Sequence, residues 1–351
     1  MKYLFLSFLF IISYPEAVSQ KLLDNLEYNS NYIRIVNADV QSKLRVFRGN
    51  IVELDHLHNT PAIIGNIDYD NGHTTFTPLV PFDIATPYTA VYNRIFYPFE
   101  IAQSETYKTL GVTEIYPSIR QVPANILKWY IRFSRAVNPV RIYEHIEFFD
   151  EDGNAIDRSI LHLGAPLLSE DGTLLAIWIE PGRQKQLLGP NQHLGSVFKP
   201  HKTYTLRIAG TLKDAQGVPI DSTFRHTFAT TESDRIIPSL TGWKVQSIKS
   251  GQNTPLKIIC DEQLDYGSLT DAFSIIRDYK EVNGTLTYDS EINTVYFTPS
   301  HNWKKGTYTI SLEQKLEDLA GNNLIRLFDR PILQNNGNRT PPQLTIKTVC
   351  N

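Results

Sequence analysis

Residues Gly284–Thr309 read GTLTYDSEINTVYFTPSHNWKKGTYT, and this stretch decides the fold because the chain contains it in more than one version. The earlier version, Gly65–Thr89, reads GNIDYDNGHTTFTPLVPFDIATPYT. Both begin with glycine, reach tyrosine four residues later, and continue through Phe-Thr-Pro and an aromatic residue to Tyr-Thr. A looser version between them has Ile179-Glu180-Pro181 for Phe-Thr-Pro and ends at Tyr204-Thr205. Copies about a hundred residues apart are typical of tandem compact domains rather than of a solenoid.

Each version lies among short segments that are alternating or briefly apolar and that end at Asn, Asp or Gly. The segments that end the second and third domains, Leu212–Phe224 and Leu316–Phe328, also match. Each has an Asp two residues after its first leucine and a Gly three residues after that Asp. Such an Asp bonds the backbone two residues on and such a Gly takes positive φ, so both phrases predict hairpins. No stretch has sustained helical periodicity, and only one helical turn is expected, within Gln263–Phe273. The pattern predicts an all-β fold of tandem Ig-like antiparallel β-sandwich domains.

The repeats place the domain boundaries. Matching opening phrases at Ile115–Ile119 and Ile236–Leu240 mark where two of the domains begin. In the first domain the pattern lacks one edge strand, and residues 20–30 look like a lead-in. The predicted organisation is a signal peptide at 1–19, a divergent Ig-like domain at 20–104, an Ig-like domain at 112–232 with an inserted loop at 182–198, an Ig-like domain at 233–335, and a C-terminal tail at 336–351.

The N-terminus has the pattern of a secretory signal peptide. Lys2 supplies the positive charge, Leu4–Ile12 the apolar segment, and Ala17-Val18-Ser19 the cleavage site, so we predict cleavage before Gln20. Pro15-Glu16 ends the apolar run well short of the roughly 20 residues that span a bilayer. We expect an exported protein without a transmembrane segment in its mature chain, located in the periplasm, at the outer surface, or outside the cell.

Charge and motifs exclude several classes of function. The chain of 351 residues has 34 basic and 37 acidic residues, well mixed, which is not the footprint of a nucleic-acid-binding protein. It has no Gly-x-Ser-x-Gly elbow, no His-Glu-x-x-His, no phosphate-binding glycine loop and no Rossmann fingerprint. We therefore predict a protein that is not an enzyme and that uses no cofactor.

Three polar segments were weighed as metal sites. Asp55–His58 has two imidazoles that a strand would turn to one side, but no third ligand, so it is interpreted as an exposed polar turn. Asp150–Asn154 and Asp318–Asn322 are rich in oxygen ligands, but their spacing fits ordinary turns better than a calcium loop. We predict no metal site.

Two cysteines occur, Cys260 and Cys350. An even count in an exported chain favours a disulfide, which would close a loop of about 90 residues and stabilise the fold by about 4–5 kcal/mol. The alternative is that Cys260, in the apolar run from Leu256, is a small core residue.

Several phrases resemble bacterial Ig-like domains of the type found in S-layer proteins. They are Phe133-Ser134, Glu180-Pro181-Gly182-Arg183, Tyr204-Thr205-Leu206 and Leu316–Asn322. The resemblance covers the second and third domains well and the first more weakly. It implies an envelope-associated, non-catalytic module. The second domain departs from the pattern at Val218, where the third has Asn322, so any role of that Asn is in doubt there.

The second domain contains the one interruption of the repeat, with 22 residues between Pro181 and Tyr204 where the third domain has eight. Long loops on a rigid sandwich often carry binding residues. The candidate ligand-binding residues, for a carboxylate, a sulfate or sugar hydroxyls, are Arg183, Lys185, Asn191 and His193. The alternative is that Arg183 pairs with an acid of a neighbouring domain and that the loop packs a domain junction.

The preferred hypothesis is a structural, adhesive or docking component of the bacterial cell envelope, with envelope proteins as partners. The alternative is a protein that binds a surface glycan or another ligand through the inserted loop and exposed aromatic residues such as Trp178 or Trp303. A binder should have a concave patch of aromatic and polar groups.

Overall fold

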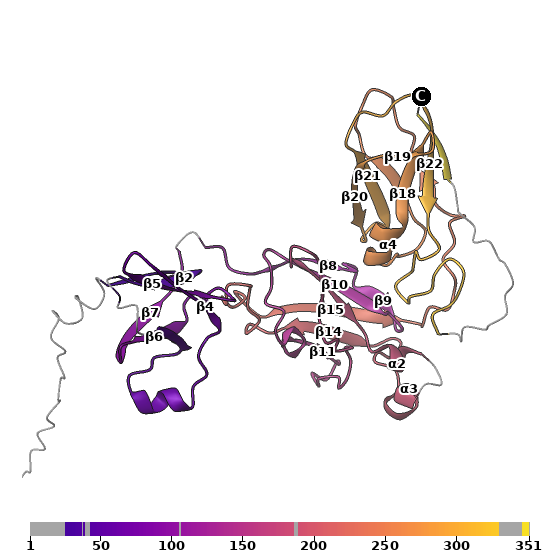
Figure 1. The fold of residues 1–351 in the computed structure, drawn as a ribbon. Helices are drawn as coiled ribbons and strands as arrows, with labels where there is room; N and C mark the ends of the chain where they lie inside the picture. Colours follow the sequence, from indigo (N-terminus) through magenta and orange to yellow (C-terminus); the bar gives the residue numbers. More distant parts are fainter. Residues whose placement is uncertain are drawn as a thin grey trace, which may run out of the picture. The chain divides into compact units, whose positions relative to one another are not determined.

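The computed structural model (Figure 1) describes residues 25–36, 38, 43–104, 107–185, 189–329 and 346–350. The predicted signal peptide lies outside the described residues and stays a prediction. The chain divides into two compact units, one formed by residues 1–109 with 213–218 and the other by residues 110–212 with 219–351.

The first unit contains seven described strands and one 3-10 helix. Their bounds are β1 (Leu26–Asn29), β2 (Tyr32–Ile35), β3 (Arg45–Arg48), η1 (Leu54–His58), β4 (Gly65–Asp70), β5 (His73–Pro78), β6 (Pro87–Tyr92) and β7 (Ile95–Glu100). One sheet has the strand order β1-β2-β5-β4 and the other the order β3-β6-β7. Aromatic side chains fill the core, where the ring centroids of Phe82 and Tyr88 are 4.9 Å apart.

The first unit differs from the sequence-based prediction at two places. β1 pairs with β2 at the edge of its sheet, so the strand expected to be missing lies in the supposed lead-in. Its pattern was hidden because an edge strand buries little; only Leu26 of its four residues is buried. The segment that includes His56 forms η1, not a strand.

The second domain, in the second unit, has two four-stranded sheets. The bounds of its elements are β8 (Val112–Tyr116), β9 (Gln121–Pro123), β10 (Lys128–Phe133), η2 (Ile142–His145), β11 (Ile146–Phe149), β12 (Leu167–Leu168), β13 (Leu174–Trp178), α2 (Pro181–Gln184), α3 (Gly189–Leu194), β14 (Thr203–Ile208) and β15 (Phe224–Thr231). The sheet orders are β12-β13-β10-β8 and β11-β14-β15-β9. Trp129, Ile131 and Phe148 lie fully buried in the core of this domain.

The third domain, in the same unit, repeats this architecture. The bounds of its elements are β16 (Lys244–Val245), β17 (Leu256–Ile259), α4 (Tyr266–Ala272), β18 (Phe273–Arg277), β19 (Lys280–Glu281), β20 (Gly284–Asp289), β21 (Thr294–Pro299), β22 (Gly306–Leu312) and β23 (Ile346–Cys350). Its sheets have the orders β16-β17-β21-β20 and β19-β18-β22-β23. The helical turn predicted within 263–273 is α4. β23 corrects the predicted tail, because it pairs with β22 and so covers backbone groups that would otherwise lie at a sheet edge.

The repeated stretch forms the same hairpin in the first and third domains. Gly65 pairs with Pro78 in β4–β5, and Gly284 pairs with Pro299 in β20–β21. A Cβ at Gly284 would lie 2.4 Å from the ring of Phe297, and one at Gly65 would lie 2.4 Å from the Thr77 carbonyl oxygen. Both copies therefore need glycine, because the neighbouring strand approaches too closely for any side chain.

The repeated Tyr-Thr phrase gives each domain the same corner. The hydroxyl of Tyr88 accepts a hydrogen bond from the Asp83 amide at 2.9 Å, and the hydroxyl of Tyr204 accepts one from the Lys199 amide at 2.8 Å. The Tyr308 hydroxyl accepts from the Lys304 amide at 2.9 Å. In all three domains the tyrosine ties the loop before its own strand. The all-β, Ig-like fold is thus confirmed.

Candidate functional site

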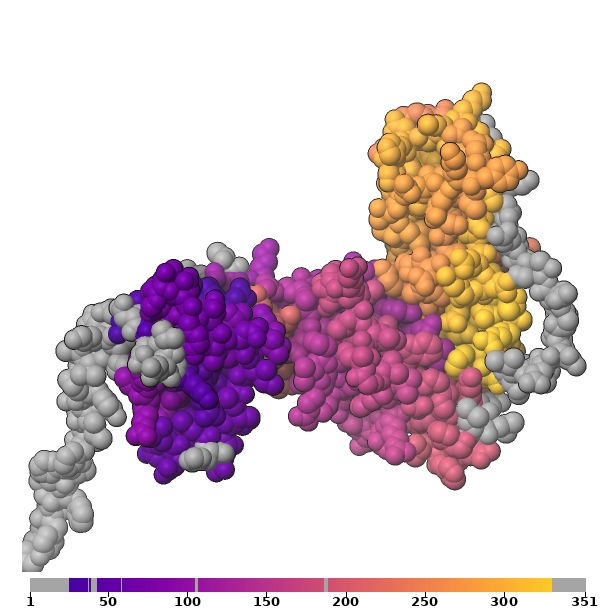
Figure 2. All heavy atoms as spheres, viewed as in Figure 1, coloured from indigo at the N-terminus to yellow at the C-terminus, as the bar shows by residue number. Residues whose placement is uncertain are grey.

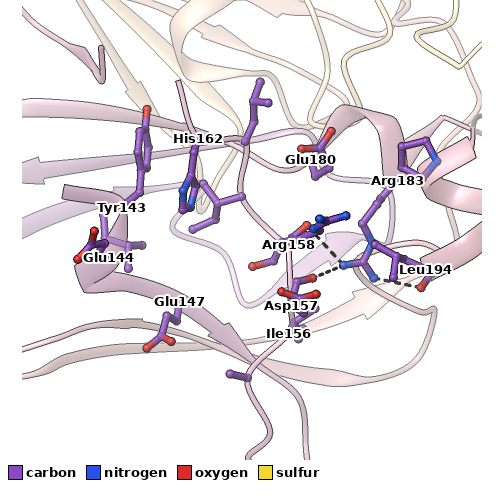
Figure 3. A pocket seen from close by; sticks show the side chains of 16 residues that line it. Tyr143, Glu144, Glu147, Ile156, Asp157, Arg158, His162, Glu180, Arg183 and Leu194 are labelled. Carbon is purple, nitrogen blue, oxygen red and sulfur yellow. Dashed lines mark hydrogen bonds between the residues drawn. The ribbon is translucent and has the colours of Figure 1, made fainter. Parts of the chain in front are cut away.

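The inserted loop borders a cavity with a volume of about 750 Å³ (Figure 3). One wall comes from the insertion, through Arg183, Pro190 and Leu194. The opposite walls come from η2 and from the irregular segment 155–162, which leads from β11 toward β12. Pro181 begins α2 and the side chain of Glu180 accepts the Gly182 amide, so capping starts the insertion as a helix.

Arg183 anchors the insertion. Its side chain is buried, and its Nε donates to the Gly195 carbonyl at 3.0 Å. The other two guanidinium nitrogens donate to four further carbonyls, those of Asp157, Arg158, Leu194 and Ser196, at 2.5–3.5 Å. Burial lowers the pKa of this guanidinium, while the charges of Asp157 and Glu180 oppose that effect. Arg183 therefore holds the loop to the segment beneath it.

The other predicted ligand-binding residues lie apart from one another. The Lys185 ammonium lies 4.4 Å from the ring centroid of Phe328, in the third domain. The Asn191 side chain donates to the Arg183 carbonyl, and His193 is exposed on α3. Their role in ligand binding stays a prediction. The structure does not bring the four together as one site, because the segment 189–194 coils into a helix that separates their side chains.

The cavity walls carry both charge and apolar surface. Of the carboxylates in its lining, Glu144 pairs with Arg141 and Glu147 with Arg207. The ring of Tyr143 stacks on that of His162, with centroids 5.0 Å apart and planes at 13°. Ile156, Ile160 and other aliphatic residues complete the lining. Charges of both signs and a stacked pair suit a polar ligand of mixed character.

A second cluster, at the junction of the second and third domains, escaped the sequence analysis. Lys128 of β10 donates to Glu317 at 2.6 Å and to Asp265 at 3.4 Å. The Tyr130 hydroxyl lies 3.0 Å from both carboxylate oxygens of Asp265. Burial alone would lower the pKa of Lys128, but the negative charges of Asp265 and Glu317 raise it overall. We name these four side chains, Lys128, Tyr130, Asp265 and Glu317, the junction cluster.

Local structure sets the geometry of the junction cluster. Asp265 caps α4 by accepting the Ser268 amide at 2.8 Å, which fixes its carboxylate beneath Lys128. Lys128 and Tyr130 are two residues apart on β10, so both side chains leave the same face of the sheet. Beside them the rings of Tyr116 and Tyr266 stack with centroids 4.0 Å apart. In Figure 2 the atoms of the second and third domains meet along this junction.

The predicted Asp hairpins are confirmed, and one of them also ties the linker between the two domains. Asp318 accepts the amides of Ala320 and Asn322 at 2.8 and 3.0 Å. The Asn322 side chain donates to the carbonyls of Asp234 and Ile236, both at 3.3 Å. Val218 stands at this position in the second domain, where the Asp214 carboxylate instead accepts a hydrogen bond from the Tyr107 hydroxyl of the preceding segment.

Three carboxylates meet near this linker. Asp234, Glu262 and Asp318 each offer an oxygen within 4.8 Å of the others. The pKa of Asp318 is raised to about 7, mainly by burial; the charge of Asp234 also raises it, whereas the hydrogen bonds from Asn322 lower it. A buried carboxyl that keeps its proton close to neutral pH relieves repulsion within such a group.

Two further expectations concern single residues. Trp303 is not an exposed aromatic: its side chain is buried, because its indole Nε1 donates to the Thr254 carbonyl at 2.8 Å inside the core. Trp178 is half-buried, with the Lys128 ammonium 4.8 Å from its ring centroid. Cys260 is buried, whereas Cys350 is the last residue of β23 and its side chain lies outside the described residues. The disulfide stays a prediction.

Comparison with known proteins places one domain in a family. Residues 239–330 match the family model described as a bacterial Ig-like domain. These residues, which form most of the third domain, are therefore similar to a bacterial Ig-like domain, in agreement with the resemblance seen in the sequence. No curated protein matches the chain.

Several solved structures are similar at low identity. Escherichia coli alpha-2-macroglobulin, over domains MG0-NIE-MG1, is 12% identical with a TM-score of 0.23, and the match covers 59% of this chain and 67% of that one. The N-terminal part of the bacterial S-layer protein SbsC is 13% identical with a TM-score of 0.23, and the match covers 59% of this chain and 40% of that one. Extracellular domains 3–5 of Drosophila OTK are 11% identical with a TM-score of 0.17, covering 81% of this chain and 88% of that one. At this level of similarity none of them bears on function.

In the described part of the chain, no helix combines the length and the apolar character that crossing a bilayer requires.

Proposed function

We propose that this chain is an exported, non-catalytic module of the bacterial cell envelope that acts as a structural, adhesive or docking component. The observation that carries the proposal is the junction cluster, which ties the second and third Ig-like domains through buried ion pairs. Buried charge pairs across a junction favour one arrangement of the two domains, which would suit a component that holds other molecules at a set spacing. The bacterial type of the third domain and the predicted signal peptide support an envelope location.

The test is fractionation of the native host followed by cross-linking of the full chain. We expect the protein in the envelope, periplasmic or secreted fraction, cross-linked to envelope proteins. A matched variant without residues 1–19 should stay in the cytoplasm. Recovery of the full chain in the cytoplasm, or a chain with no cross-linked envelope partner, would contradict the proposal.

A second candidate function is ligand binding at the cavity beneath the insertion. The observation that favours it is the Arg183 anchor, which holds the insertion over an open volume instead of letting it collapse onto the sandwich. A glycan array probed with the full chain tests this function. Binding that survives Arg183→Ala together with Lys185→Ala would place the ligand elsewhere.

A further inference from the structure

Gln184, the residue after Arg183, lines a second and smaller cavity of about 230 Å³. Its side chain is 6% exposed. Its Nε2 donates to the Ile126 carbonyl at 2.8 Å, and its Oε1 has no hydrogen-bond partner. A flipped amide would place Oε1 next to the Ile126 carbonyl oxygen, and two acceptors cannot form a hydrogen bond. The orientation of the Gln184 amide is therefore determined. A buried carbonyl oxygen without a donor costs about 1–3 kcal/mol, which calls for a group that satisfies it.

Apart from Ala124, the rest of the lining is polar, and it comes from three separate segments. Asn125 lies between β9 and β10, Asn191 and Ser196 belong to the insertion, and Ser233 and Arg235 belong to the linker between the second and third domains. Asn191 donates its Nδ2 to the Arg183 carbonyl, which turns its amide in a single direction. Arg235 is held by Asp329 through Nε at 3.0 Å. Within the described residues, the hydroxyls of Ser196 and Ser233 make no hydrogen bond.

These groups select one kind of ligand. Gln184 offers an acceptor, the serine hydroxyls both donate and accept, and the Arg235 guanidinium donates. The lining has no carboxylate to attract a cation, and its single guanidinium is already paired with Asp329, which disfavours an anion. A ligand whose neighbouring groups each donate and accept fits this arrangement, and such groups are the hydroxyls of a sugar.

Size points the same way. Water occupies about 30 Å³ in the liquid, so the cavity is too large for one or two ordered waters. It is also smaller than the roughly 300 Å³ at which pockets for drug-sized ligands begin. A single sugar ring matches a volume between these limits.

We propose that the cavity formed by Gln184, Asn191, Ser196, Ser233 and Arg235 binds one hydroxyl-rich sugar residue, as a monosaccharide or as the end of a glycan. The proposal extends the second candidate function by naming a ligand class and by moving the site from the large cavity to the small one. The Gln184 oxygen accepts a sugar hydroxyl proton, and a serine hydroxyl or Arg235 donates to the same or the next sugar oxygen. A bound sugar would contact the insertion and the interdomain linker together.

The test uses the full mature chain, ¹⁵N-labelled, titrated with glucose, N-acetylglucosamine and mannose at millimolar concentration. We expect at least one of these sugars to shift the side-chain amide signals of Gln184 and Asn191. The affinity should fall at least tenfold in Gln184→Leu and severalfold in Ser233→Ala. Ser222→Ala, an exposed serine of the same domain outside the cavity, is the matched control and should leave binding unchanged. Thermal unfolding of each variant confirms that it is folded.

Three results would overturn the proposal. One is that none of the three sugars shifts the Gln184 amide in the wild-type chain. Another is that a sugar binds equally to wild type, Ser233→Ala and Ser222→Ala. The last is a crystal structure grown with the sugars that holds only ordered waters in this cavity. Each of these is measured on purified protein, so it is independent of the cell fractionation that tests the envelope location.

Discussion

The junction cluster and the insertion both bury a cation, but they neutralise it in different ways. Lys128 meets two carboxylates that come from the third domain, Asp265 and Glu317. Among the described residues, the Arg183 guanidinium donates its hydrogen bonds to backbone carbonyls of its own domain. An ammonium is a compact charge that needs opposite charge nearby, whereas a guanidinium spreads five donors over a plane and can serve several carbonyls. The lysine therefore links two domains, and the arginine holds one loop in place.

The largest effect is expected from removing a counter-charge at the junction cluster. Asp265→Ala leaves Lys128 with one carboxylate and deletes the cap of α4. We expect the free energy of unfolding to fall by about 3–5 kcal/mol, because an incompletely compensated charge stays buried. Urea denaturation measures this. The control is Asp271→Ala, which removes an exposed acid from the same helix. An equal loss in both variants would show that the destabilisation does not come from the junction cluster.

The second prediction concerns the hydrogen bonds that the Arg183 guanidinium donates to backbone carbonyls. Arg183→Lys keeps the charge but cannot reach five carbonyls, so some become unpaired. We expect a loss of about 2 kcal/mol and faster amide exchange around Gly195, since hydrogen bonds to charged groups contribute about 1.5–3 kcal/mol each. Arg158→Lys, an exposed neighbour that lines the same cavity, should change little. If the two variants behave alike, Arg183 is not the anchor of the insertion.

Asp318 is a third buried ionisable group. Its hydrogen bonds among the described residues come from the N–H groups of Ala320 and Asn322 and not from a cation. Its pKa is raised from 3.8 to about 7, first by burial. The folded chain thus binds a proton that the unfolded chain releases above about pH 4. This group's contribution to stability is complete below about pH 4 and is lost as the pH rises to about 7, by at most about 1.4 kcal/mol per pH unit. Urea unfolding at several pH values measures the slope.

The control for this pH dependence is Asp234→Asn. The charge of Asp234 contributes to the raised pKa of Asp318, so removing it should lower that pKa, end the loss of stability at a lower pH and make the total loss smaller. A total loss that is unchanged in this variant, or stability that rises between pH 4 and 7 in the wild type because of this group, would contradict the assignment.

The smallest effect is expected at Lys185, whose ammonium lies over the ring of Phe328. Lys185→Ala should cost about 0.5–1 kcal/mol, the usual size of an exposed cation–π contact. Lys185→Arg, which keeps the cation, should restore most of the loss in chemical denaturation. Equal losses for Ala and Arg would indicate that the contact contributes nothing.

Much of the fold was predictable because the interactions that specify its turns and corners join residues close in sequence. Gly284 with Phe297, Tyr308 with Lys304, and Asp318 with Asn322 are contacts between residues close in sequence. A turn or corner of this kind needs particular residue types at a set spacing, and that spacing repeats wherever the domain repeats. β1 was missed because an edge strand buries too little to leave an alternating pattern.

The candidate site was predicted only as a location. The insertion stood out by its length, and it does border both cavities. Arg183 was chosen as a residue that could meet a ligand, yet its donors all serve backbone carbonyls. Gln184, one residue later, was not among the predicted site residues, although its side-chain oxygen is buried without a hydrogen-bond donor. A sequence shows which donors a side chain owns but not which acceptors the folded chain brings to them.

From its sequence alone, then, this chain is determined as a series of Ig-like sandwiches with a loop inserted in the second. The tertiary structure decided how the second and third domains are joined and how the buried charges are neutralised. Lys128 and Asp265 are 137 residues apart. Nothing in the local pattern around either residue specifies the other, because an ion pair depends on where two separately folded surfaces meet.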